Sequence, residues 1–181
     1  MTTLLSLGGS LFAKAEYENP TGSIKDRAAL AILEDAAQRG WLPPGGTVIE
    51  ATSGNMGISL AAIAAKQGYR CIIVMPDSMS PERRQIIQTY GAEVMLTPGD
   101  LGMQGAVEKA AELAQKIPDS FLAGQFENSA NVLAHYQGTG PEIWADTNGK
   151  VDIFVAGIGT GGTVTGIGRY LKEQNPQVQI V

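Results

Sequence analysis

Short apolar segments alternate with helical segments along nearly the whole chain. Residues 47–51, 70–75, 93–96 and 151–156 read as strands, and each is followed by a loop and a stretch with helical character. Connections of this length favour right-handed β-α-β units, in which helices cover both faces of a parallel sheet. The sequence therefore predicts an α/β fold.

The remaining elements follow from periodicity and from glycine and proline punctuation. Helices are expected at residues 24–39, 81–90, 102–117, 132–146 and 163–174, with an alanine-rich helix ending near 67, and further strands at 11–16, 121–123 and 178–181. The first helix is expected to bury a stripe made of Ala28, Leu30, Ile32, Leu33 and Ala36. A polar stretch at residues 128–131 indicates a boundary between two α/β lobes.

Composition restricts the classes of function. The 181 residues are 44% hydrophobic and carry a net charge of −5, which disfavours nucleic acid or an anionic membrane as a partner. No apolar stretch approaches the roughly 20 residues of a membrane span, and residues 1–10 do not resemble a signal peptide. Cys71 is the only cysteine and lies in a strand-like segment, which predicts a cytoplasmic protein without internal disulfides.

His135 is the only histidine in the chain. A Ser-His-Asp arrangement or a metal site with several histidines therefore has no further support, and we expect no metal. We interpret His135 as a structural or partly exposed residue.

A turn, a helix start and a lysine follow one another at residues 18–27, Glu-Asn-Pro-Thr-Gly-Ser-Ile-Lys-Asp-Arg. The Asn-Pro step favours a turn, and Thr21 or Ser23 can cap the helix that follows. Lys25 falls in the first helical turn, where the helix dipole disfavours a protonated amine by up to about 1 kcal/mol. This position favours an uncharged, nucleophilic amine near neutral pH, and the solvated start of a surface helix is the alternative.

Two loops that follow strands are rich in small polar residues, and open parallel sheets bind ligands at this edge. Residues 52–57, Thr-Ser-Gly-Asn-Met-Gly, offer hydroxyls, an amide and helix-start N–H groups that suit a carboxylate. Helix capping by Ser53 or Asn55 is the alternative reading. Residues 157–163, Gly-Ile-Gly-Thr-Gly-Gly-Thr, are typical of a loop that cradles phosphate.

The second loop also matches the dinucleotide pattern G-x-G-x-x-G through Gly157, Gly159 and Gly162. A dinucleotide site expects an acidic residue about 20 positions later, at the end of the next strand. Residues 178–181, Val-Gln-Ile-Val, contain none. The two threonine hydroxyls suit a terminal monophosphate better than a bridging pyrophosphate.

Taken in order, these motifs resemble those of the cysteine synthases (O-acetylserine sulfhydrylases), which belong with cystathionine β-synthase among the pyridoxal-phosphate enzymes. The resemblance covers residues 12–181 and extends to Met-Pro-Asp at 75–77, Gln-Phe at 125–126 and Thr-Gly-Pro-Glu-Ile-Trp at 139–144. Segments 80–84 and 134–136 are closer to the B-type enzymes.

The resemblance implies a fold and a division of the chain. The fold is the three-layer parallel-sheet fold of the tryptophan synthase β type. Residues 1–128 would form the amino-terminal lobe with the lysine and the substrate loop. Residues 129–181 would begin a second, incomplete lobe with the phosphate loop.

The resemblance also implies roles for single residues. Lys25 would bind the aldehyde of pyridoxal 5′-phosphate and then act as the base on the α-proton of the substrate, while Asn55 would hydrogen-bond the ring hydroxyl of the cofactor. The residues implied to hold the phosphate are Gly159, Thr160, Gly161, Gly162 and Thr163. Those implied to bind the substrate carboxylate are Thr52, Ser53, Gly54, Met56 through its backbone, and Gln125.

In the intact enzyme, the implied reaction replaces the acetate of O-acetylserine by sulfide, or by thiosulfate in B-type enzymes, and the implied assembly of the full-length protein is a homodimer. Whether the 181 residues are active by themselves is left open. Met56 departs from the family pattern, which has threonine there. The chain is also shorter than family members and is expected to be truncated at both ends. A non-catalytic homologue that keeps the fold remains open, as does a serine/threonine dehydratase or a cystathionine β-synthase-like activity.

Overall fold

The structure, a computed structural model, describes residues 1–181, which form two compact units. We call Ile32–Gln125 the central unit, and Met1–Ala31 together with Phe126–Val181 the terminal unit. Helix α1 (Lys25–Gln38) contains residues that belong to each unit. The division into lobes at residues 1–128 and 129–181 stays a prediction.

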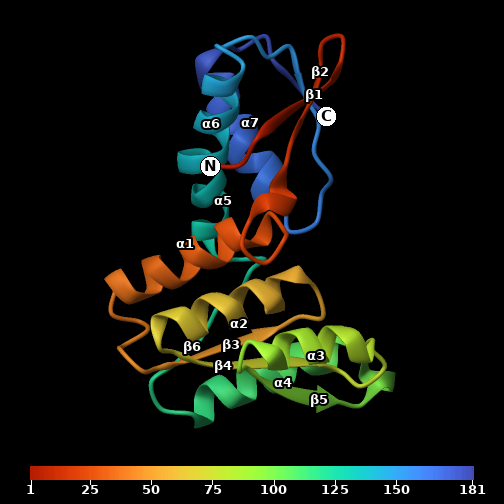
Figure 1. Cartoon of the computed structure of the whole chain (residues 1–181). Coiled ribbons are helices and arrows are strands. Elements are labelled where there is room, and N and C mark those ends of the chain that lie inside the picture. The colour runs from red at the N-terminus through yellow and green to blue at the C-terminus, as the bar shows by residue number, and fades with distance from the viewer. The chain divides into compact units, whose positions relative to one another are not determined.

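The central unit is built on a parallel sheet with the strand order β5-β4-β3-β6 (Figure 1). All three strand pairings are parallel, because a helix connects each strand to the next along the chain. The parallel sheet and the strand at residues 47–51 are therefore confirmed. The elements are β3 (Thr47–Ala51), α2 (Asn55–Gln67), β4 (Arg70–Pro76), α3 (Pro81–Thr89), β5 (Glu93–Thr97), η2 (Gly99–Leu101), α4 (Gly102–Lys116) and β6 (Ser120–Leu122).

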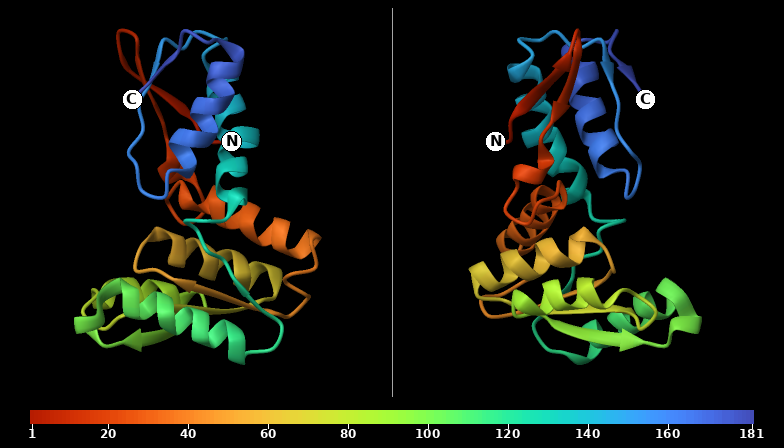
Figure 2. Two further views of the ribbon diagram at one scale, coloured as in Figure 1. Left: turned by 180° about the vertical axis from the view of Figure 1, so that it is seen from behind. Right: turned by 45° about the vertical axis from the view of Figure 1, so that its right-hand side comes forward.

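Helices α2 and α4 cover opposite faces of this sheet (Figure 2), because successive strand side chains point to opposite sides. The side chains on one face of the sheet pack on Ala106 and Ala110 of α4. The strand residues on this face are Ile49, Ala51, Ile72 and Val74. On the other face, Ile73 lies against Gly57 of α2, where an added Cβ would be 3.3 Å from the Ile73 Cγ2. The polar loops after β3 and β6 therefore emerge at the same edge of the sheet.

The terminal unit contains two short pairs of strands. β7 (Ile153–Phe154) and β8 (Gln179–Ile180) are parallel, whereas β1 (Leu4–Gly8) and β2 (Leu11–Lys14) form an antiparallel hairpin followed by a 3-10 helix (Glu16–Glu18). The hairpin departs from the parallel arrangement that we expected throughout. Gly8 and Gly9 adopt φ values of +104° and +58°, which glycine accepts without strain and which let the chain reverse.

The helical part of the terminal unit packs around its own core. α5 (Ser129–Ala134), a π-helical turn (His135–Thr139) and α6 (Gly140–Asp146) form one continuous run, which covers the helix expected at residues 132–146. α7 (Gly162–Gln174) packs against it. The buried core residues are Ile143, Val151, Ile167, Leu171 and Val178.

Helix α1 corrects one part of the expected buried stripe. Leu30 is 40% exposed, whereas Ala29 is fully buried. The buried face runs through Ala28, Ala29, Ile32, Leu33 and Ala36. This set repeats every three to four residues as one helical face requires, and Leu30 lies off it.

None of the helices combines the length and apolar character that crossing a bilayer requires.

At Gly166, α7 lies close against the backbone of the neighbouring helical run, and Gly166→Ala is expected to lower the free energy of unfolding by about 2 kcal/mol. An added Cβ would lie 2.4 Å from the Val132 carbonyl oxygen and 2.9 Å from the Tyr136 backbone nitrogen, neither of which can rotate away. This overlap outweighs the gain in helix propensity, about 1 kcal/mol.

Gly168→Ala in the same helix is the matched control. Its Cβ would meet only the Ile180 side chain, at 3.4 Å or more. Urea denaturation followed by circular dichroism should show it neutral or stabilised. Equal stability of the two variants would contradict the close approach at Gly166.

Candidate active site

Lys25 is the first residue of α1, and its surroundings lie within the terminal unit. The Ser23 hydroxyl accepts a hydrogen bond from the Lys25 backbone N–H at 3.3 Å, and the Asp26 carboxylate accepts one from the Thr21 N–H at 2.7 Å. The Lys25 side chain is half-buried, and its Nζ lies 3.3 Å from the Thr160 Oγ1. Burial lowers the pKa of Lys25 below its ordinary value. The sequence also predicted a lowered pKa for Lys25, and in the structure the cause of the lowering is burial of the amine.

The glycine-rich loop leads from β7 into α7. Gly161 has a φ of +80°, and α7 begins at Gly162 with no side chain capping its first turn. The Asn131 Nδ2 donates to the Thr160 Oγ1 at 2.8 Å, and a Cβ at Gly162 would lie only 2.2 Å from the Asn131 Oδ1. Glycine at position 162 is therefore required for the helix start to approach Asn131.

Asn131 and His135 were not identified as site residues from the sequence. They lie four residues apart and so share one helical face, and the His135 Nε2 lies 3.3 Å from the Thr163 Oγ1. The His135 Nδ1 lies 2.9 Å from the Thr139 Oγ1, and the ring is 1% exposed. The structural interpretation of His135 is confirmed, and partial exposure is wrong. The spacing of four residues was the one available signal.

Burial, together with the positive charges of Arg27 and Lys25, lowers the pKa of His135 to about 4. The imidazole is therefore neutral at physiological pH. A neutral ring can donate at one nitrogen and accept at the other, so it can hold both threonine hydroxyls.

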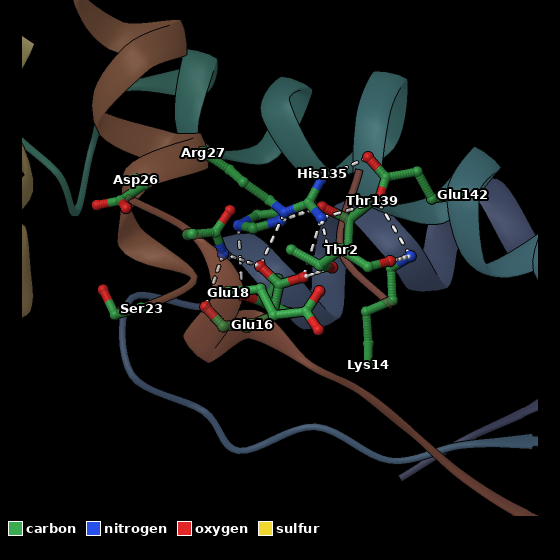
Figure 3. A network of polar contacts seen from close by, with 12 residues as sticks. Thr2, Lys14, Glu16, Glu18, Ser23, Asp26, Arg27, His135, Thr139 and Glu142 are labelled. Atoms are coloured by element: carbon green, nitrogen blue, oxygen red, sulfur yellow. Dashed lines mark hydrogen bonds and ion pairs between the residues drawn. The ribbon is translucent and has the colours of Figure 1, made fainter. Parts of the chain in front are cut away.

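Arg27, two residues after the lysine, anchors the start of α1 (Figure 3). Its Nε lies 2.8 Å from the Glu16 Oε2 and its Nη1 lies 2.7 Å from the Glu142 Oε1. Lys14 adds ion pairs to Glu142 at 3.1 Å and to Asp146 at 2.7 Å. Segments far apart in the sequence are thereby fixed around the helix that carries Lys25.

In the central unit, the polar loop after β3 is held by its backbone. The Thr52 N–H donates to the Val74 carbonyl oxygen at 3.0 Å, and the Thr52 Oγ1 accepts from the Gly54 N–H at 3.1 Å. α2 begins at Asn55 after Gly54, with no side chain capping it. The capping alternative for Ser53 and Asn55 is therefore wrong, and the helix start keeps N–H groups for an anion.

Two further contacts define this loop. The Arg83 Nη1 donates to the Ser53 carbonyl oxygen at 3.1 Å. Met56 is 1% exposed, so its side chain packs in the core.

Gln125 ends the central unit, after β6, and is 6% exposed. Its Nε2 lies 3.4 Å from the Glu50 Oε1. The segment that carries Gln125 lies beside β3, because β6 pairs with β3. The Ala123 N–H extends this pairing by donating to the Ile49 carbonyl oxygen at 2.9 Å.

Each unit therefore brings together a different part of the expected set. The terminal unit places the Lys25 amine beside a threonine of an anion-cradling loop. The central unit places small polar residues and a helix start after β3. No cluster of three or more His, Cys, Asp or Glu side chains is arranged to hold a metal ion.

The family described as "Pyridoxal-phosphate dependent enzyme" matches residues 3–181 of this chain. The chain is 49% identical over 181 residues to a cysteine synthase of a Flavobacterium species, covering 100% of this chain and 59% of that protein. It is 51% identical over 178 residues to cysteine synthase B of Campylobacter jejuni, covering 98% of this chain and 60% of that protein.

Among solved structures, the cysteine synthase (OASS) of Entamoeba histolytica matches with a TM-score of 0.94 and 42% identity. The match covers 99% of this chain and 56% of that one. The chain thus spans less than two thirds of the length of these three relatives.

Proposed function

This chain belongs to the pyridoxal-phosphate dependent enzymes, as its motifs predicted, and we propose that it carries the lysine and substrate loops of a cysteine synthase. The proposed reaction forms cysteine from O-acetylserine and sulfide. The observation that carries the proposal is the 3.3 Å approach of the Lys25 Nζ to Thr160 in the glycine-rich loop. A lysine amine and a phosphate cradle are the two groups that an aldehyde cofactor with a phosphate requires.

The residues present fit this cofactor. Gly157 and Gly159 have open space where a Cβ would stand, and α7 begins without a side-chain cap, so the loop can surround an anion. Gly159, Thr160, Gly161, Gly162 and Thr163 would hold the phosphate, with Asn131 and His135 supporting the two hydroxyls. Pyridoxal phosphate, when bound, supplies an electron sink for chemistry at the α-carbon of an amino acid.

The chain's own residues would divide the remaining work. Lys25, whose pKa burial lowers, can bind the aldehyde and later accept the α-proton at Nζ. Asn55 would donate to the ring hydroxyl. The substrate carboxylate would be bound by Thr52, Ser53, Gly54, the Met56 backbone and Gln125.

The proposal also covers the sulfur donor, the location and the assembly of the full-length protein. We propose sulfide as the sulfur donor, with thiosulfate as a second donor because of the B-type segments. We also propose that the full-length protein is a cytoplasmic homodimer. Product analysis separates the alternatives: cysteine with sulfide and S-sulfocysteine with thiosulfate support a synthase, whereas pyruvate without sulfide supports a dehydratase.

Lys25→Ala is expected to abolish covalent attachment of the cofactor. After incubation with pyridoxal phosphate and borohydride reduction, peptide mass spectrometry of the unmodified chain should find the label on Lys25. The matched control is Lys150→Ala, which removes an exposed lysine of the same unit and should leave labelling unchanged. Labelling that persists in Lys25→Ala would contradict the assignment of Lys25.

A further inference from the structure

Glu50 is a buried carboxyl that the proposed reaction does not use. It is the fourth residue of β3, two positions before Thr52, and is 4% exposed. Apolar surroundings disfavour an isolated carboxylate, so a carboxyl kept here needs hydrogen-bond partners. Those partners lie in the segment after β6.

Two consecutive residues of that segment direct hydrogen-bond donors at Glu50. The Gln125 Nε2 lies 3.4 Å from the Glu50 Oε1, and the backbone N–H groups of Gly124 and Gln125 also donate to the carboxyl. The Glu50 Oε2 has no hydrogen-bond partner. The contacts therefore gather on one side of the carboxyl, toward Gln125.

An acceptor beside Gln125 fixes the orientation of its amide. The two ends of a glutamine amide have nearly the same shape, and only the nitrogen end donates. The Glu50 Oε1 accepts from Nε2, and in the neutral acid the proton can lie on the unpartnered Oε2, which leaves Oε1 an acceptor. Turning the amide over would then bring two acceptor oxygens together in either charge state. Rotamer freedom of Gln125, which binding would otherwise have to remove, is restricted in advance.

β3 and β6 are neighbouring strands, so Glu50 also links the loop after β3 to the segment after β6 at this edge of the sheet. The register pairs Ile49 with Leu122, which places Glu50 level with Ala123. The same strand thus carries Thr52 on its continuing loop and holds Gln125 through Glu50.

We propose that Glu50 is a positioning residue for recognition of the substrate carboxylate, acting by orienting the Gln125 amide beside the loop at residues 52–54. This inference rests on the proposed function, because it takes Gln125 as a carboxylate ligand. Glu50 itself contacts no substrate.

The charge state of Glu50 agrees with this role. Burial raises its pKa to about 7, so near neutral pH about half of the molecules carry the neutral acid. A neutral acid beside a carboxylate site avoids the repulsion that a permanent negative charge would cause. Cys71 on the neighbouring strand stays neutral as well, because burial raises its pKa to about 12.

The first test reads the Gln125 amide directly, without cofactor. In a nitrogen-15-labelled chain, Gln125→Ala identifies the side-chain amide signals, which should be dispersed and protected from solvent exchange. Glu50→Ala should collapse them to the positions of a mobile glutamine, and Glu50→Gln, which keeps an acceptor, should retain them. Unchanged signals in Glu50→Ala would overturn the proposal.

The second test separates positioning from loss of structure. In the cofactor-loaded full-length protein, Glu50→Ala should raise KM for O-acetylserine by about tenfold with kcat within about threefold, and Glu50→Gln should restore KM. Cys71→Ala, which removes a neighbouring buried side chain, should leave KM unchanged. A fall in kcat with unchanged KM, or an equal effect of Cys71→Ala, would overturn the role in recognition.

The two arms also separate this inference from the proposed function. A cofactor-loaded full-length protein that does not turn over O-acetylserine contradicts the proposed function. The amide spectra still decide whether Glu50 orients Gln125.

Discussion

Replacing Arg27 by methionine is expected to lower the free energy of unfolding of the terminal unit by about 3–5 kcal/mol. The side chains of Arg27, Glu16 and Glu142 are 14%, 16% and 13% exposed, so water screens this ion cluster poorly. Without the guanidinium, both carboxylates remain buried. Lys14 still offsets Glu142 at 3.1 Å, so most of the loss should come from Glu16. Urea denaturation followed by circular dichroism measures the change.

Arg169→Met is the matched control in the same unit. Arg169 pairs with Glu173 at 3.0 Å, but these side chains are 62% and 44% exposed, so the expected loss is about 1 kcal/mol or less. Arg27→Lys should fall between the two, because lysine keeps the charge but cannot contact both carboxylates with a planar fork. A loss in Arg27→Met no larger than that in Arg169→Met would contradict a buried cluster.

The Arg27 cluster illustrates what local sequence patterns do not contain. Its ion pairs join residues 11 and 115 positions apart, and no periodicity or spacing relates them. The central unit was predictable for the opposite reason. Continuous apolar runs such as residues 71–75 and clear helix starts such as Pro81 are local signals, and each gave the correct element.

The misses have the same physical basis. The strand at Leu4–Gly8 is stable only because it pairs with β2. No local sequence pattern predicts this pairing. Leu30 is exposed although it is apolar, because the buried face is set by the direction in which α1 packs.

The approach of Lys25 to Thr160 joins positions 135 residues apart. The loops alone suggested only an amine and an anion site, and the family resemblance connected them. His135 had no predicted role in the site, because a single histidine forms no recognisable motif. Its link to Thr163 exists only in three dimensions.

Lowering the pH from 7 to 4 is expected to remove about 3 kcal/mol of stability from the terminal unit through His135 alone. Burial lowers the pKa of His135 to about 4 from an ordinary 6.5. Between these values the unfolded chain binds a proton that the folded chain does not. The contribution is therefore complete above pH 6.5 and is lost as the pH falls toward 4. Because this is the only histidine, one C2–H resonance reports its titration directly.

The pH dependence of the whole chain does not isolate this effect, because Glu50 acts with the opposite sign. Burial raises the pKa of Glu50 to about 7 from 4.5, so the folded state takes up a proton in this window and gains stability as the pH falls. The comparison that isolates His135 is the native chain against His135→Asn. Their difference in unfolding free energy should shrink by about 3 kcal/mol from pH 7 to pH 4. A C2–H midpoint at about 6 to 7, or a difference that does not change with pH, would show that the folded protein accepts a charged imidazole beside Arg27.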